Sequence, residues 1–365
     1  MKTFPGLFFI LSLFPAFFFS PLPAQGQSQP HISPSVAADY IHAVIEADRT
    51  IYSEFIVERL TETVNLPATE NWQQDNTLLL PAQFLLNASR HVEKNESGLH
   101  YRLMSLWPIN PDNGPSSENE KAGLGEVLKN SDRPFIWIGK FNGKTRFNAI
   151  YPDLAVTKSC AKCHNAHPNS PRKDFSKGDV MGGIHISFPV QQRTGDDKAN
   201  SYTVAPEVVA DYVHAILDAD RSVYAGTVVN RLQNKGVIYA TENWWEENTL
   251  LLPAQFLLNA SELIRHRKPG LDFKLISLWP INPHNGAANE FESTGLKAVS
   301  DQPVRPYIGK VHIGNRDYFQ AVYPDIANTP ACVQCHNGHA KSPRHDFKLF
   351  DVIGGIVVSV PLGQD

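Results

Sequence analysis

The sequence predicts an α+β fold made of two tandem copies of one domain. Residues 36–190 recur as residues 208–362, at an offset of 172 residues, and the block Leu78–Ala88 returns letter for letter from Leu250. This repeat is far longer than one unit of a solenoid, so each copy is predicted to be a whole domain. Within each copy, helical periodicity comes first and strand-like alternation follows, an order typical of α+β domains.

The repeat and its flanks define the expected domain boundaries. We expect the first domain over residues 36–190, a polar linker over 191–206 and the second domain over 207–362. At 365 residues, with 42% hydrophobic residues, the chain is long enough to build two cores. Because each copy is large enough to bury its own core, we also expect the two domains to fold separately.

The expected elements of the first copy follow from caps, periodicity and turn residues. Ser33 and Pro34 are an N-cap and a first-turn proline, and helical spacing continues to about Leu60. Later in the copy, Asn142-Gly143 predicts a hairpin between two strands. The other predicted elements are a helix over Pro81–His91, a strand over Tyr101–Trp107, a helix over Glu118–Leu128, the hairpin strands Arg133–Lys140 and Thr145–Tyr151, and a last strand over Asp179–Val190.

The N-terminus has the pattern of a secretory signal peptide over residues 1–24. Lys2 supplies the positive charge, an apolar stretch reaches Phe19, and cleavage is expected near Ala24. The alternative is an uncleaved membrane anchor, but Pro15 and Pro21 interrupt the apolar run. We therefore expect an exported, periplasmic protein with no membrane span in the mature chain. The net charge of −4 and the lack of a basic stripe argue against nucleic acid as a partner.

All four cysteines lie in two Cys-x-x-Cys-His motifs, one in each copy, which we expect to lie in loops. Cys160 and Cys163 are followed by His164, and Cys332 and Cys335 by His336. This pattern is the attachment signature of a c-type haem, in which two thiols bond the porphyrin and the histidine is the proximal iron ligand. A zinc site would place its cysteine pairs closer together in the chain, and a redox disulfide needs no adjacent histidine. The sequence therefore predicts two covalently bound c-type haems.

Residues that match between the copies provide candidates for the distal side of each haem. Of the 14 histidines, only three pairs coincide at the repeat offset. One pair is the predicted proximal ligand, and a second, His167 and His339, is too close to it in the chain to reach the opposite haem face. His42 and His214 are the candidate distal ligands, and they share a helix face with an arginine and a tyrosine. On that face Arg49 and Arg221 are candidates for propionate contacts, and Tyr52 and Tyr224 are alternative distal ligands.

The ordered motifs resemble a PAS-like family of single-haem c-type domains, some of whose members are haem-based redox sensors. The resemblance implies an antiparallel sheet flanked by N-terminal helices, with the haem held between the cysteine motif and those helices. Some members use a cysteine as distal ligand, and this chain departs from them because both cysteine pairs are already assigned. The resemblance is carried by Leu80-Pro81-Ala82, Asn110-Pro111-Asp112-Asn113, Glu120, Tyr151-Pro152 and Cys160 to His164, and by the equivalent residues of the second copy.

Three classes of function fit these features. A dihaem cytochrome that transfers single electrons to or from a redox partner protein is the first. A redox or gas sensor acting through a partner is the second, and a dihaem peroxidase is the third. No repeated acid–base pair accompanies the haem motifs. We therefore expect an electron-transfer protein rather than an enzyme.

Overall fold

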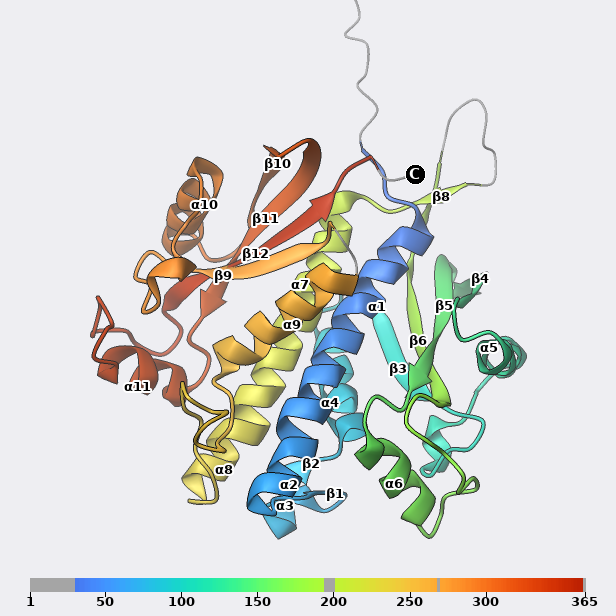
Figure 1. The fold of residues 1–365 in the computed structure, drawn as a ribbon. Helices are drawn as coiled ribbons and strands as arrows, with labels where there is room; N and C mark the ends of the chain where they lie inside the picture. The colour runs from blue at the N-terminus through green and yellow to red at the C-terminus, as the bar shows by residue number, and fades with distance from the viewer. Residues whose placement is uncertain (1–29, 194–200, 268–269, 364–365) are drawn as a thin grey trace, which may run out of the picture.

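The computed structural model describes residues 30–193, 201–267 and 270–363. The chain forms two units of the same architecture, each with a long N-terminal helix, a four-stranded antiparallel sheet and a short helix outside that sheet (Figure 1). The predicted α+β class and the tandem arrangement are therefore confirmed. The expected signal peptide lies outside the described residues, as does part of the expected linker.

The helices of unit 1 begin where the sequence indicates. Helix α1 starts at Pro34, and the Ser33 hydroxyl accepts a hydrogen bond from the Val36 backbone N–H, as expected of an N-cap. Proline also occupies the first turn of α4. The helical elements are α1 (Pro34–Ile51), the π-helix η1 (Tyr52–Glu58), α2 (Arg59–Val64), α3 (Trp72–Asp75), α4 (Pro81–Lys94), the 3-10 helix η2 (Pro111–Asn113), α5 (Glu118–Lys129) and α6 (Lys158–Ala166).

The sheet of unit 1 has the strand order β3-β6-β5-β4, and all its pairings are antiparallel. Asn142 and Gly143, both with positive φ, form the predicted turn between β4 and β5. The strand predicted over Tyr101–Trp107 is shorter, because Ser105 turns away and donates its backbone N–H to Asn113. The strands are β3 (His100–Met104), β4 (Phe135–Phe141), β5 (Lys144–Leu154) and β6 (Val180–Pro189), together with the short pair β1 (Ala68–Thr69) and β2 (Leu78–Leu79).

Unit 2 repeats this plan with the strand order β9-β12-β11-β10. A small hairpin, β7 (Gln191–Gln192) with β8 (Tyr202–Thr203), connects the units. The elements of unit 2 are α7 (Pro206–Val223), the π-helix η3 (Tyr224–Asn230), α8 (Arg231–Asn234), α9 (Pro253–Arg267), β9 (Asp272–Ile276), the 3-10 helix η4 (Pro283–Asn285), α10 (Glu290–Asp301), β10 (Tyr307–Ile313), β11 (Arg316–Ile326), α11 (Pro330–Gly338) and β12 (Val352–Pro361).

The N-terminal helix of each unit contains one π-helical segment, which periodicity did not predict. The segments η1 and η3 are each seven residues long and occupy equivalent positions in the repeat. A π-helical segment inside an α-helix rotates the residues that follow it and is often found at functional sites. Here each segment directly follows the helix turn that carries Arg49 or Arg221.

The four long helices form one layer between the two sheets (Figure 1). Helix α1 packs against α9 and α7, and α4 packs against α7. One continuous hydrophobic cluster includes buried residues of both units, and equivalent rings meet within it, since Phe84 contacts Phe256 edge to face at 5.9 Å. Separate folding of the two units is still only a prediction, and this shared core weighs against it.

Two equivalent arginines connect the units across this layer. The Arg59 guanidinium of unit 1 donates to the carbonyl oxygens of Trp244 and Thr249 in unit 2. In return, Arg231 donates to the carbonyl oxygens of Trp72 and Thr77. The exchange is reciprocal, so the two units are related by an approximate two-fold axis.

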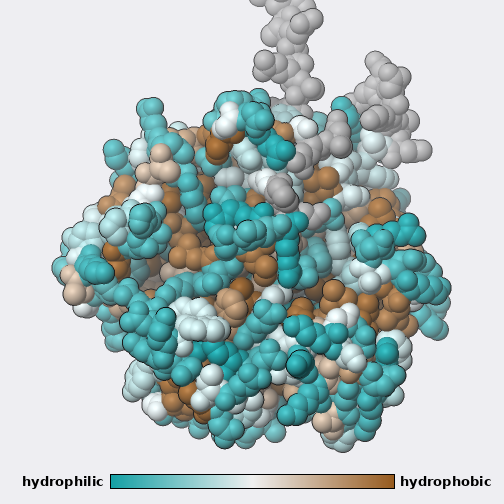
Figure 2. All heavy atoms as spheres, viewed as in Figure 1, coloured by the Kyte–Doolittle hydropathy of each residue, from teal (hydrophilic) through white to brown (hydrophobic). Residues whose placement is uncertain are grey.

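On the face drawn in Figure 2, hydrophobic residues lie in small groups among hydrophilic ones. No helix among the described residues combines the length and apolar character that a membrane span requires.

Candidate haem-attachment sites

Each Cys-x-x-Cys-His motif lies on a short helix, α6 or α11, and not in the expected loop. The Thr157 hydroxyl accepts a hydrogen bond from the Cys160 backbone N–H and so begins α6 as its N-cap. Residues three apart on a helix share one face, which brings Cys160 and Cys163 together. Both are free thiols, with Cys163 exposed and Cys160 half-buried, and the cysteines of α11 repeat this arrangement.

A loop that follows each motif fixes the orientation of the motif histidine. The Asn165 side chain of α6 both donates to and accepts from the backbone of Phe175. The Phe175 ring then meets the His164 ring edge to face, with centroids 6.0 Å apart. The Arg172 guanidinium lies over the rings of both Phe175 and Trp107. Unit 2 builds the same arrangement from Asn337, Phe347, His336, Arg344 and Trp279.

Both motif histidines are held in the neutral form that binds metals. Burial lowers the pKa of His164, Asp153 opposes this shift, and Arg49 adds to it. Burial lowers the pKa of His336 in the same way, again with an arginine, Arg221, adding to the shift. A neutral imidazole has a free lone pair for a metal ion at neutral pH.

The candidate propionate contacts, Arg49 and Arg221, lie beside the motifs. The Arg49 guanidinium forms an ion pair with Asp153 at 2.7 Å and donates to the carbonyl oxygen of Leu154, the last residue of β5. Arg221 forms the equivalent ion pair with Asp325. Both arginine side chains are buried, so each site holds a fixed positive charge whose first partner is an aspartate.

The candidate distal ligands, His42 and His214, stack on tyrosines of the sheet. His42 lies parallel to the Tyr151 ring at 4.0 Å, and His214 lies parallel to Tyr323 at 3.8 Å. Burial lowers the pKa of His214 to about 4. Arg221 adds to the lowering of the pKa of both His214 and His336, so its charge lies near both histidines.

The alternative distal candidates, Tyr52 and Tyr224, lie in the shared core. Tyr52 is fully buried, stacks on Phe84 at 4.3 Å and donates its hydroxyl proton to the Leu79 carbonyl oxygen. Tyr224 does the same with Phe256 and Leu251. To bind an iron, either tyrosine would have to leave this hydrogen bond.

Two contacts that the sequence did not indicate hold the two ends of α6 in place. Glu58, the last residue of η1, accepts hydrogen bonds from the backbone N–H and the hydroxyl of Ser159. At the other end, His167 lies 3.3 Å from a Glu70 carboxylate oxygen. The second contact recurs between His339 and Glu242, so the His167/His339 pair connects the end of each motif helix to a turn that lies outside the four long helices.

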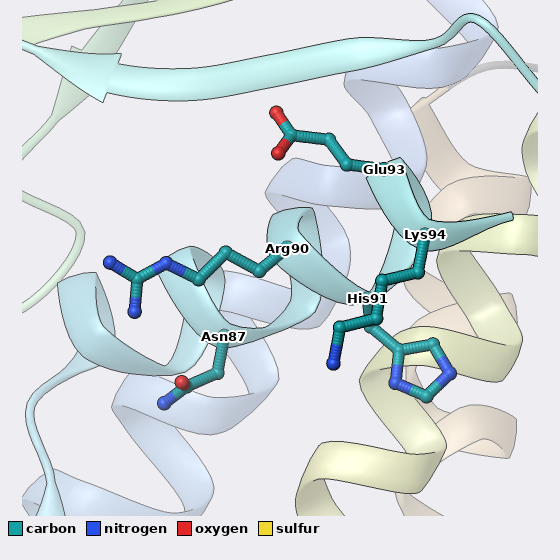
Figure 3. A pocket seen from close by; sticks show the side chains of 5 residues that line it. All are labelled: Asn87, Arg90, His91, Glu93 and Lys94. Carbon is teal, nitrogen blue, oxygen red and sulfur yellow. The ribbon is translucent and has the colours of Figure 1, made fainter. Parts of the chain in front are cut away.

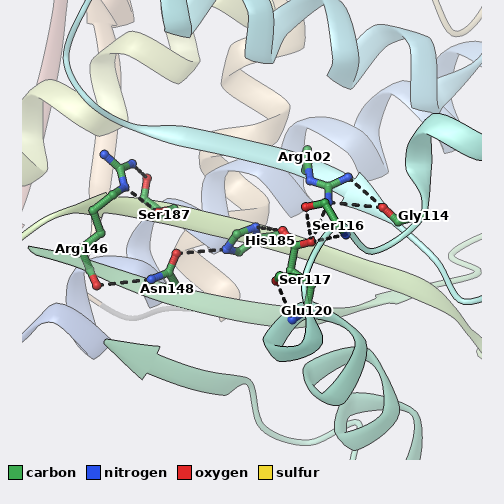
Figure 4. A network of polar contacts seen from close by, with 9 residues as sticks. All are labelled: Arg102, Gly114, Ser116, Ser117, Glu120, Arg146, Asn148, His185 and Ser187. Atoms are coloured by element: carbon green, nitrogen blue, oxygen red, sulfur yellow. Dashed lines mark hydrogen bonds and ion pairs between the residues drawn. The ribbon is translucent and has the colours of Figure 1, made fainter. Parts of the chain in front are cut away.

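The Glu120 side chain stabilises the loop between β3 and α5. It accepts hydrogen bonds from Ser116, forms an ion pair with Arg102 at 2.9 Å and lies 3.3 Å from His185 (Figure 4). Burial raises the pKa of this carboxyl group, but the hydrogen bonds from His185 and Ser116 and the Arg102 charge outweigh it, and the net shift is downward. Its counterpart Glu292 is also buried and pairs with Lys274, so this recurrent acid has a structural role.

One surface pocket lies elsewhere, on the exposed side of α4 (Figure 3). It is lined by Asn87, Arg90, His91, Glu93 and Lys94 and contains no residue of either motif. Among the described residues, no group of three or more histidine, cysteine or acidic side chains has the geometry of a metal site.

The fold and these sites define a class of α+β protein with two equivalent cysteine–histidine helices, each placed beside a buried arginine. Residues 28–189 and 196–361 each match the Tll0287-like family model, and the chain belongs to this family as a tandem pair. No curated protein and no solved structure gives a significant match to the chain.

Proposed function

We propose that the protein is an exported dihaem c-type cytochrome that transfers single electrons. The observation that carries this proposal is the duplicated motif helix, with two free thiols on one face and a neutral histidine beside them. Membership of the Tll0287-like family supports a haem-binding, cytochrome-like protein with a PAS-like domain. A c-type haem supplies one-electron chemistry at its iron, which needs no protein nucleophile.

The residues around each motif fit such a group. The His336 Nδ1 atom is buried and has no hydrogen-bond partner among the described residues, so local contacts leave this imidazole uncommitted. The side chains of Phe175 and Phe347 fix the ring planes of the proximal histidines. Arg49 and Arg221 supply buried positive charge, which would favour an anionic propionate nearby.

Mass spectrometry of the denatured protein tests the proposal. Protein matured in a cell that attaches c-type haem should have the mass of the processed polypeptide plus two haems, because each motif supplies both thioether bonds. A mass equal to that of the bare polypeptide would overturn the proposal. Stopped-flow reduction by small donors should then be rapid and reversible, whereas sustained peroxide turnover would place the protein among the peroxidases.

His42 and His214 are proposed as the distal ligands. In His214 the Nε2 atom has no hydrogen-bond partner among the described residues, and the low pKa keeps the ring neutral. His214→Ala should convert one haem from low spin to high spin, or let it bind carbon monoxide, and leave the other haem unchanged. Tyr224→Phe is the matched control, because it removes only the bond to Leu251. If the spectrum of His214→Ala equals that of the wild type, the assignment is wrong.

The second candidate function is a redox or gas sensor. It is favoured by the π-helical segments next to Arg49 and Arg221 and by the single helical layer, through which a change at one motif could reach the other. Carbon monoxide binding by the wild-type protein distinguishes the two functions. An electron carrier with two ligands on each iron should not bind it, whereas an iron with an exchangeable position should.

A further inference from the structure

Two buried carboxyl groups, one from each unit, lie close together where α1 packs against α7. Asp48 of α1 and Asp220 of α7 occupy equivalent positions in the repeat, and both are 0% exposed. Each acts on the pKa of the other, and none of their four oxygen atoms has a hydrogen-bond donor among the described residues. Two carboxylates have only acceptors, so they can hydrogen-bond to each other only if one of them is protonated.

A third polar group lies in the same environment. The Tyr101 side chain of β3 is 4% exposed, and its hydroxyl group has no hydrogen-bond partner among the described residues. Burial raises the pKa of Tyr101, and the charges of Asp220, Asp48 and Glu93 raise it further. Its counterpart in unit 2 is Phe273, which has no hydroxyl group.

The cationic side chains next to Asp48 and Asp220 in the sequence form ion pairs with other carboxylates. Arg49 and Arg221 directly follow the two aspartates, but their guanidinium groups form ion pairs with Asp153 and Asp325 at the motifs. At the rim of the α1–α9 contact, Arg267 forms an ion pair with Glu46 at 3.0 Å. No cation acts on the pKa of either carboxyl group in the part of the chain that is described.

We propose that Asp48 and Asp220 form a proton-binding site that holds one shared proton between the two units at neutral pH. Two unpaired charges in a dry interior would repel each other strongly and have little solvation. One shared proton replaces that repulsion with a hydrogen bond across the interface, in which a carboxylic acid donates to a carboxylate. Loss of the proton restores the repulsion and weakens the interface between the units. The site thus makes the coupling of the two units sensitive to pH.

The direction of the pH effect follows from linkage. Burial raises the pKa of both carboxyl groups above that of an unfolded aspartate, which is about 3.9. The contribution of the proton to stability is therefore fully present below that value. It is lost as the pH rises through the folded pKa. His214, whose pKa is lowered, contributes in the opposite direction, so the effect must be measured against a variant that lacks only the two carboxyl groups.

The test compares the wild-type, full-length holoprotein with the double variant Asp48→Asn, Asp220→Asn. Asparagine keeps the shape and the hydrogen bonding but holds no ionisable proton. Between about pH 5 and pH 8, the unfolding equilibrium constant of the wild type should rise relative to that of the variant, by up to about tenfold per pH unit. Glu46→Gln is the matched control, because it removes an acid of α1 that is ion-paired. The ratio of the wild-type unfolding constant to that of Glu46→Gln should not change with pH in this window.

Infrared spectroscopy provides a readout that does not depend on the variant's stability. At neutral pH the wild type should show a carboxylic-acid carbonyl band that is absent from the double variant and disappears on raising the pH. The comparison with the double variant is needed because burial also raises the pKa of Asp211 and Asp272, which could contribute to the same band. A pH-independent ratio of unfolding constants, or equal carboxylic-acid bands in the two proteins, would overturn the proposal. Both measurements are independent of whether the haem assignment is correct.

Discussion

The double variant Cys160→Ala, Cys163→Ala is expected to carry one haem in place of two. Both thioether bonds of one haem would be removed, while α11 would keep both thiols and its histidine. The motif helix α6 packs in a small cluster of its own with Ala155 and Phe175, separate from the shared core. Losing the haem of unit 1 should therefore leave unit 2 folded. Mass spectrometry and the absorbance of the denatured haem measure the remaining stoichiometry.

The mirrored double variant Cys332→Ala, Cys335→Ala is the matched control. It should also retain one haem. The spectrum of that haem should differ from the spectrum of the haem that remains in Cys160→Ala, Cys163→Ala. The surroundings of the motifs differ, because Glu58 binds Ser159 in unit 1 whereas Asn328 donates to Ser222 in unit 2. Two haems remaining in either variant would show that the motif is not the attachment site.

Much of the fold could be read from the sequence because its signals are local. The cap Ser33, the first-turn proline of α4 and the Asn142-Gly143 turn each act within a few residues, and the structure confirms all three. The π-helical segments η1 and η3 were missed because one extra residue in a long helical pattern barely changes its periodicity. A loop was predicted at the motif because the helix there, α6, has only nine residues and its start depends on one local cap, Thr157.

The candidate site was harder to predict because it depends on contacts across the chain. Matching the two copies pointed to Arg49 and His42, but not to their partners Asp153 and Tyr151, which approach only when β5 lies beside α1. The expectation of two separate domains rested on the length of each repeat. Length says nothing about which helix face is apolar, and here the faces of α1 and α7 are buried against the other unit.

Unit 2 expressed alone, as residues 201–363, is expected to form a homodimer rather than a monomer. Its α7 and α9 would expose the faces that normally pack against α4 and α1. Exposed apolar faces of this kind favour association. Because the units are related by an approximate two-fold axis, a second copy of unit 2 can supply equivalent faces. Light scattering or sedimentation should give twice the mass of the polypeptide.

The contacts of Arg231 with the other unit provide a specific test of this dimer. In the full chain Arg231 donates to the carbonyl oxygens of Trp72 and Thr77, whose counterparts in unit 2 are Trp244 and Thr249. Each copy's Arg231 should therefore bind these two carbonyl groups of the other copy. Arg231→Met, which keeps an apolar stem but no donors, should weaken the dimer about tenfold or more, because hydrogen bonds to a charged group contribute about 1.5–3 kcal/mol each.

The same dimer would bring two copies of Asp220 together in place of Asp48 and Asp220. If the buried pair holds one shared proton, dimerisation of unit 2 should strengthen as the pH falls from about 8 to about 5, and Asp220→Asn should remove that dependence. Lys310→Gln is a suitable control, because its ion pair with Asp317 is exposed and joins the neighbouring strands β10 and β11, away from the helical layer. A monomeric unit 2 with a native haem spectrum at micromolar concentration would show that the repeat folds independently, and that the helical layer is a contact between two complete domains.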